Sequence, residues 1–102
     1  MDFGLEATYV LRLQNDKWYV GKSTHLYERL SQHFNGNGSK WTKMYPPISV
    51  EDVIPHNCEE EATLWYMNLH GVSNVRGYSW CQPVLSKYGL DNIHSKLYLY
   101  RL

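Results

Sequence analysis

The chain has 102 residues, of which 43% are hydrophobic, so it is long enough for one globular domain with a modest core and too short for two. Ten basic and ten acidic residues balance, and this zero net charge argues against a protein that binds nucleic acid through its overall charge. Without a membrane-length apolar run, a secretory signal at the start or more than two cysteines, the chain is expected to be intracellular with both thiols free.

The first elements expected along the chain are two strands of a hairpin. Residues 7–13 are β-branched and aromatic with period-two alternation, which is typical of a strand. Asn15 and Asp16 are expected to form a two-residue turn, and residues 17–21 to return as the second strand. Because so short a turn joins them, the two strands are predicted to be antiparallel.

A helix and a third strand are expected next. Ser23 or Thr24 is a suitable cap for a helix that reaches about Phe34. The glycine- and asparagine-rich residues 35–39 end this helix. Residues 48–54 have the composition of a strand.

The second half is expected to begin with a helix over residues 59–70, because three glutamates in its first turn suit the helix dipole and Gly71 is a natural stop. Apolar residues beyond Pro83 indicate a last helix or a mixed segment. The order predicts an α+β fold, with a small three-stranded antiparallel sheet flanked by helices in a single domain over residues 1–102.

The hairpin and the first helix carry side chains suited to attack on a phosphodiester. Tyr9 and Tyr19 lie ten residues apart, while Arg29 and His33 share one helix face. A phenol can relay a proton, and a guanidinium forks onto two phosphate oxygens. A phenol with a pKa near ~10 needs a metal or cations nearby to act as a base. The plain alternative is that the tyrosines are cross-strand packing partners and that Arg29 is a solvated surface charge.

These residues resemble the paired signature of the GIY-YIG nuclease superfamily, here as Ala7-Thr8-Tyr9 and Tyr19-Val20-Gly21. Arg29 and His33 follow the second tyrosine as in that family. Ala7 and Thr8 depart from the Gly and Ile of the family name, at positions where a strand tolerates many side chains. Two further stretches resemble small stand-alone bacterial and viral members: Gly38-Ser39-Lys40-Trp41-Thr42 and Asn74-Val75-Arg76-Gly77. The resemblance covers residues 7–77 and leaves residues 78–102 as a C-terminal extension.

The resemblance implies roles for the residues of the signature. Tyr9 or Tyr19 would relay the proton from the attacking water, and His33 would position or protonate. Arg29 would neutralise the scissile phosphate with Lys22 beside it. Gly21 and Asn74 would brace the site, Asn74 by hydrogen bonds to an active-site loop.

The resemblance also implies one divalent metal, Mg²⁺ or Mn²⁺, held by a glutamate near the start of the second helix. Glu59, Glu60 and Glu61 cannot all face one way, because successive helical residues point about 100° apart. The stretch that begins at Glu61 looks most like the family, so Glu61 is favoured and Glu60 comes next. A zinc site is not expected, because the His and Cys residues lack a paired Cys-x-x-Cys.

Nucleic acid is the expected partner because the basic residues are unevenly distributed. Six of them lie in the first half of the chain: Arg12, Lys17, Lys22, Arg29, Lys40 and Lys43. Trp41 between Lys40 and Lys43 predicts a base-stacking platform with phosphate-binding cations, although a hydrophobic plug fits the pattern equally well.

The sequence therefore predicts a divalent-metal-dependent endonuclease that hydrolyses DNA phosphodiester bonds. The alternative is a nucleic-acid-binding module that has the nuclease fold but weak or no catalysis, which the zero net charge would also fit. No membrane is expected as a partner. A homodimer or a targeting partner would strengthen the weak DNA binding expected of so small a domain.

Overall fold

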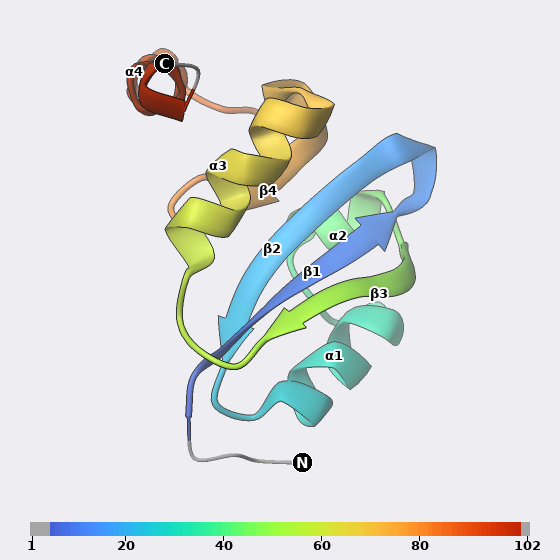
Figure 1. Ribbon diagram of the computed structural model, residues 1–102. Coiled ribbons are helices and arrows are strands. Elements are labelled where there is room, and N and C mark those ends of the chain that lie inside the picture. Colours follow the sequence, from blue (N-terminus) through green and yellow to red (C-terminus); the bar gives the residue numbers. More distant parts are fainter. Residues whose placement is uncertain (1–4, 101–102) are drawn as a thin grey trace.

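The computed structural model describes residues 5–100 and contains one mixed sheet with strand order β3-β1-β2-β4 (Figure 1). β1 (Ala7–Leu13) pairs antiparallel with β2 (Lys17–Ser23) and with β3 (Pro47–Ile54). β4 (Val75–Gly77) runs parallel to β2. The α+β class and the first three strands are confirmed. The prediction of a three-stranded, purely antiparallel sheet is wrong, because a three-residue strand is too short to show a sequence period.

The hairpin turn between β1 and β2 contains three residues, Gln14–Asp16, rather than the predicted two. Asn15 and Asp16 have φ of 61° and 56°. Both residue types tolerate this left-handed region because their short polar side chains bond to nearby backbone. The turn therefore joins the strands with Leu13 paired to Lys17.

The helices lie on both faces of the sheet (Figure 1). They are α1 (Leu26–Phe34), α2 (Lys40–Met44), α3 (Glu59–His70) and α4 (Lys87–Tyr100). Strand residues alternate between the faces. One core contains Tyr9, Leu11, Leu13, Tyr19 and Trp41, with Leu26 and Leu30 of α1 packed against it. The other contains Val10, Trp18, Val20 and Val75 with Ala62, Leu64, Met67, Ile93 and Leu97 of α3 and α4.

The two helices of the second half agree with the sequence prediction, whereas the predicted cap of α1 is wrong. The helix over residues 59–70 is confirmed, and the segment beyond Pro83 contains α4. Ser23 and Thr24 do not cap α1, because the residue at its N-terminal boundary is His25. The Ser23 hydroxyl instead accepts the backbone N–H of His25 at 2.9 Å and shapes the turn that enters the helix. Within residues 5–100, no helix combines the length and the hydropathy needed to cross a bilayer.

Candidate active site

Three aromatic side chains from β1, β2 and α1 form one buried cluster. The ring centroids of Tyr9 and Tyr19 are 6.3 Å apart. The ring of His33 lies 5.6 Å from that of Tyr9 and 5.1 Å from that of Tyr19. All three side chains are buried. The structure thus brings together three of the side chains that the sequence predicted for the site.

A chain of hydrogen bonds assigns the protons in this cluster. His33 Nδ1 is 3.1 Å from the Thr42 hydroxyl, and that hydroxyl donates to the Ser39 carbonyl, also at 3.1 Å. We assign the tautomer that suits these bonds, in which Thr42 accepts the Nδ1–H of His33 and Nε2 is unprotonated. The Tyr9 hydroxyl, 2.8 Å from Nε2, is then the donor to it.

Burial keeps these groups in their neutral forms. Burial, followed by the positive charge of Arg29, lowers the pKa of His33 to about 4. Burial raises the pKa of Tyr9 to about 12, although the charge of Arg29 and its hydrogen bond to the phenol oppose the rise. Burial likewise raises the pKa of Tyr19. At neutral pH the cluster therefore contains two phenols and a neutral imidazole.

Two glycines allow the close approach of the side chains in this cluster. Gly21 pairs with Tyr9 across the hairpin, and a Cβ at Gly21 would overlap the Tyr9 hydroxyl. A Cβ at Gly38 would overlap Nδ1 of His33 and lie 2.7 Å from the Thr42 hydroxyl. Both positions therefore require glycine for steric reasons, although neither has a positive φ.

Arg29 provides the cation beside the phenols. Its guanidinium donates to Gln32 Oε1 at 2.7 Å and to the Tyr9 hydroxyl. The side chain is half-buried and lines a surface hollow of about 200 Å³. The guanidinium thus reaches both the buried tyrosine and a solvent-accessible space.

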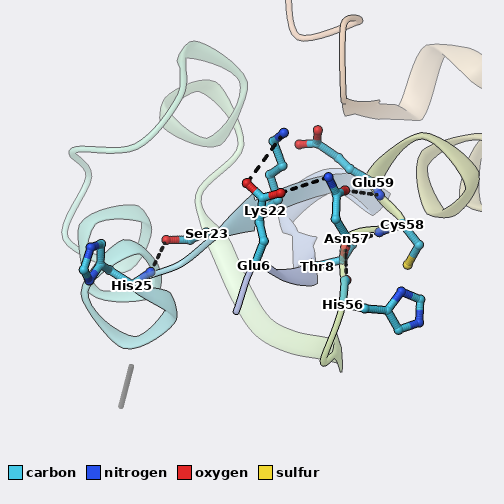
Figure 2. Close-up of polar contacts among 9 residues, drawn as sticks. All are labelled: Glu6, Thr8, Lys22, Ser23, His25, His56, Asn57, Cys58 and Glu59. Atoms are coloured by element: carbon cyan, nitrogen blue, oxygen red, sulfur yellow. Dashed lines mark hydrogen bonds and ion pairs between the residues drawn. The ribbon is translucent and has the colours of Figure 1, made fainter. Parts of the chain in front are cut away.

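Glu59 is the glutamate of α3 that lies near the phenols. Its charge raises the pKa of both Tyr9 and Tyr19. Burial raises the pKa of Glu59 itself, while Lys22 and a hydrogen bond from the Tyr78 backbone N–H lower it. Figure 2 shows the Glu59 carboxylate and the Lys22 ammonium pointing to the same region.

The two glutamates favoured from the sequence point elsewhere. Glu60 pairs with Lys96 of α4 at 3.3 Å. Glu61 is exposed and lines a different hollow with Trp65 and Tyr100. Two helical steps rotate Glu61 by about 200° from Glu59, so the two carboxylates cannot face the same site.

A polar network holds Lys22 and the start of α3 together (Figure 2). Lys22 Nζ lies 3.7 Å from Glu6 Oε2. The Asn57 amide donates to Glu6 Oε1 at 2.9 Å, and its oxygen accepts the backbone N–H of Glu59 at 3.2 Å. Glu6 and Asn57 therefore link the residue before β1 to the first turn of α3.

Asn74 does not brace the region around the phenols. Its side-chain oxygen accepts from Lys17 Nζ at 2.8 Å, and its amide donates to the His70 carbonyl at 2.7 Å. Lys17 begins β2, at the opposite end of that strand from Gly21. Asn74 therefore ties the end of α3 to the hairpin turn.

Trp41 is part of the core and is not a stacking platform. Its side chain is 3% exposed, and its indole N–H donates to the Trp18 carbonyl at 2.9 Å. The guanidinium carbon of Arg76 lies 4.3 Å from the centre of the Trp41 ring. The prediction that Trp41 stacks on a base is wrong, because the ring is buried. Lys40 and Lys43 are exposed, so their ammonium groups are accessible to a phosphate.

The sequence interpretation missed three residues near the site. Thr42 lies in the stretch Gly38–Thr42 that carried part of the resemblance, so its hydroxyl could have been considered as a partner of His33. Glu59 was a member of the glutamate run but was not favoured. Cys81 shares a hydrogen bond with the Tyr19 hydroxyl, and its thiol donates to the Tyr78 carbonyl at 3.0 Å. No sequence pattern indicated Cys81.

The donor set limits how a metal ion could bind. Across residues 5–100, no three His, Cys, Asp or Glu side chains gather closely enough to form a metal centre. Glu59 would be a single carboxylate ligand, with water completing the coordination. Such a ligand set fits Mg²⁺, which keeps several waters when it binds to proteins.

Comparison with known proteins gives one family. The profile of the GIY-YIG catalytic domain matches residues 6–66. The chain is 33% identical over 42 residues to UPF0213 protein YazA of Bacillus subtilis, covering 41% of this chain and 42% of the relative. It is 30% identical over 57 residues to a UPF0213 protein of Halalkalibacterium halodurans, covering 56% and 61%. A UPF0213 protein of Cupriavidus necator is 26% identical over 73 residues, covering 72% and 79%.

The match to the first two of these relatives spans less than two thirds of their length. No solved structure gives a significant match. The catalytic-domain profile covers more than half of the chain and includes Tyr9, Tyr19, Arg29, His33 and Glu59. The chain therefore belongs to the GIY-YIG catalytic-domain family.

Proposed function

We propose that the protein is a divalent-metal-dependent endonuclease that hydrolyses phosphodiester bonds of DNA. The observation that carries this proposal is the buried hydrogen-bond chain from Tyr9 through His33 to Thr42, with Arg29 beside the phenol. Membership of a catalytic-domain family supports nuclease activity. The exposed lysines of α2 support a polyanionic substrate.

The proton chemistry follows from the direction of the hydrogen bonds. The Tyr9 hydroxyl donates to His33, so the oxygen lone pair that Arg29 does not use remains able to accept a proton from water. With a pKa of about 12, Tyr9 is a poor base if it must first become a phenolate. Passing its own proton to His33 Nε2 as it accepts another keeps the phenol neutral throughout. The negative charge of a bound phosphate would offset Arg29 and help His33 to take the proton.

Arg29 and Lys22 would bind the phosphate. The Arg29 guanidinium has five N–H donors and can keep its bonds to Tyr9 and Gln32 while it donates to a phosphate oxygen. Lys22 lies next to the Glu59 carboxylate and supplies a second positive charge. These cations would stabilise the extra negative charge that develops on the phosphate in the transition state.

Glu59 would hold the metal ion. A bound Mg²⁺ or Mn²⁺ would act as a Lewis acid that polarises phosphate oxygens and lowers the pKa of coordinated water. Glu59 suits this role because its half-buried carboxylate lies near both phenols and accepts the backbone N–H of Tyr78. The Glu6–Asn57 link to the Glu59 backbone would hold the first turn of α3 in place.

Cleavage of supercoiled plasmid with Mg²⁺ or Mn²⁺ tests the proposal. The wild type is expected to nick the plasmid, and Arg29→Ala to cut at least ~100-fold more slowly. Arg12→Ala is the matched control, because Arg12 is exposed and its contacts, an ion pair of 4.0 Å with Asp16 and a guanidinium 5.9 Å from the centre of the Trp18 ring, are away from the phenols. If wild type and Arg29→Ala leave the plasmid equally intact while both shift DNA on a gel, the protein is a binding module instead.

A further inference from the structure

A third hollow, separate from those lined by Arg29 and by Glu61, adjoins Glu59 and has no role in the proposed reaction. Its volume is about 390 Å³, which is within the range of small-molecule sites. It is formed by the first turn of α3, the segment after β4 and helix α4. The side chains that define its chemistry are Glu60, Tyr78, Trp80, Tyr88, Asn92 and Lys96.

The hollow shares a wall with the catalytic groups. The backbone N–H of Tyr78 donates to the Glu59 carboxylate, while Tyr78 also lines the hollow. Glu60, the next residue along α3, lines it too. On the other side of the same segment, Cys81 shares a hydrogen bond with the Tyr19 hydroxyl. The hollow therefore adjoins Glu59, so a strand bound there would have a neighbouring nucleotide beside the hollow.

Aromatic rings provide stacking surfaces in the hollow. Tyr78 is 41% exposed, and its ring is held edge-on against Trp80 at 5.2 Å. Tyr88 is 83% exposed. An exposed tyrosine ring offers a face on which any base can stack.

The polar groups favour a neutral ligand with hydrogen-bonding edges. Asn92 presents both an amide donor and an acceptor, and two serine hydroxyls, of Ser79 and Ser86, lie along the wall. Among residues 5–100, the charged residues that line the hollow are Glu60 and Lys96, and they neutralise each other in an ion pair of 3.3 Å. A phosphate would meet no net positive charge here, whereas a nucleobase would find ring faces and amide groups.

We propose that this hollow binds an unstacked base of the DNA strand next to the bond that is cut. The inference rests on the proposed endonuclease function. A base within a regular duplex cannot place its face on Tyr78 or Tyr88 without leaving its stack, which costs a few kcal/mol unless the base is already unpaired. The protein should therefore prefer DNA that has unpaired nucleotides adjoining a duplex.

Binding measured without catalysis tests this inference. Fluorescence anisotropy in EDTA compares a duplex that has a short single-stranded flap with a fully paired duplex of the same length. The wild type is expected to bind the flap more tightly. Tyr88→Ala is expected to weaken flap binding about tenfold and leave duplex binding unchanged, while Tyr88→Phe keeps the ring and the affinity. Tyr98→Ala is the matched control, because Tyr98 is on the same helix, is 64% exposed and does not line the hollow.

Equal binding of the two DNAs by the wild type would overturn the inference, as would an unchanged flap affinity in Tyr88→Ala or an equal loss in Tyr98→Ala. Plasmid cleavage reports separately on the proposed function. A protein that cuts DNA without a Tyr88-dependent flap preference contradicts only the base-binding hollow. A protein that shows this preference but never cuts contradicts only the endonuclease.

Discussion

The Tyr9 hydroxyl donates a 2.8 Å hydrogen bond to Nε2 of His33 in the interior of the protein. The direction of this bond depends on a residue outside the pair, because Thr42 accepts the Nδ1–H and so leaves Nε2 as the acceptor. The pair therefore consists of a proton donor, Tyr9, and a proton acceptor, His33, and neither group is charged at neutral pH.

Tyr9→Phe is expected to reduce plasmid cleavage by at least ~100-fold, because it removes the only hydroxyl that is bonded to His33 Nε2 among the described contacts. It also leaves a buried acceptor unpaired, which should cost about 1–3 kcal/mol of unfolding free energy. Cleavage rates and urea unfolding measure the two effects. Tyr27→Phe, at an exposed position on α1, should change neither. Normal cleavage by Tyr9→Phe would contradict the proton relay.

Glu59→Gln is expected to abolish Mn²⁺ binding and reduce cleavage by at least ~100-fold, because it removes the carboxylate that lies near the phenols. Glu61→Gln should leave both unchanged, since Glu61 lies in another hollow. Isothermal titration with Mn²⁺ measures binding independently of cutting. If the two variants exchange these results, the metal ligand is Glu61, as the sequence alone favoured.

Acid is expected to destabilise the protein through His33. Burial and then Arg29 lower the pKa of His33 from 6.5 to about 4. Between these values the unfolded chain binds a proton at this ring and the folded protein does not, so the free energy of unfolding falls as the pH falls from 6.5 toward 4. The loss attributable to this group should approach about 3 kcal/mol near pH 4.

Urea unfolding at pH 7 and pH 4.5 measures this loss in the wild type and in His33→Gln. The variant should lose less stability in acid, while His94→Gln, at an exposed position on α4, should behave like the wild type. An identical acid sensitivity in all three proteins would show that His33 does not have a lowered pKa.

Gly21→Ala is expected to destabilise the protein by about 1–3 kcal/mol, because the added Cβ overlaps the Tyr9 hydroxyl in a packed core. Gly89→Ala is the contrasting substitution. Gly89 lies within α4, where a Cβ would come no closer than 3.4 Å to another group, so alanine should stabilise the helix by about 0.5–1 kcal/mol. Thermal unfolding compares the two. A Gly21→Ala protein as stable as the wild type would contradict the close approach.

Arg76→Lys is expected to lower the free energy of unfolding by about 3 kcal/mol, although the substitution keeps the positive charge. Its buried guanidinium donates to the carbonyls of four residues: Val72, Val75, Gln82 and Pro83. A lysine has no planar fork and cannot reach this set. Arg12→Lys, at an exposed site, should change stability little. Urea unfolding of both variants measures the difference.

Local sequence patterns predicted the elements that depend mainly on nearby residues. Period-two alternation and a turn of Asn15 and Asp16 were enough for the hairpin, and a glutamate-rich first turn with Gly71 at the end was enough for α3. β4 was not predictable, because its three residues form a strand only where β2 offers free backbone groups.

The sequence by itself determined that Tyr9 and Tyr19 lie on the two strands of one hairpin and that Arg29 and His33 extend from one face of α1, because both follow from local spacing. The register that places Tyr9 opposite Gly21 was decided by the structure, because the turn has three residues and not the predicted two. Only the tertiary structure decided which glutamate lies near the phenols. The rotation of α3 is set by Ala62, Leu64 and Met67, which pack in the core with Val10 and Val20. In this rotation Glu59 is the glutamate of α3 whose charge acts on Tyr9 and Tyr19. The tertiary structure also placed Trp41 in the core and Thr42 beside His33. Both contacts join different segments of the chain, and a local sequence pattern does not show which segments will lie side by side.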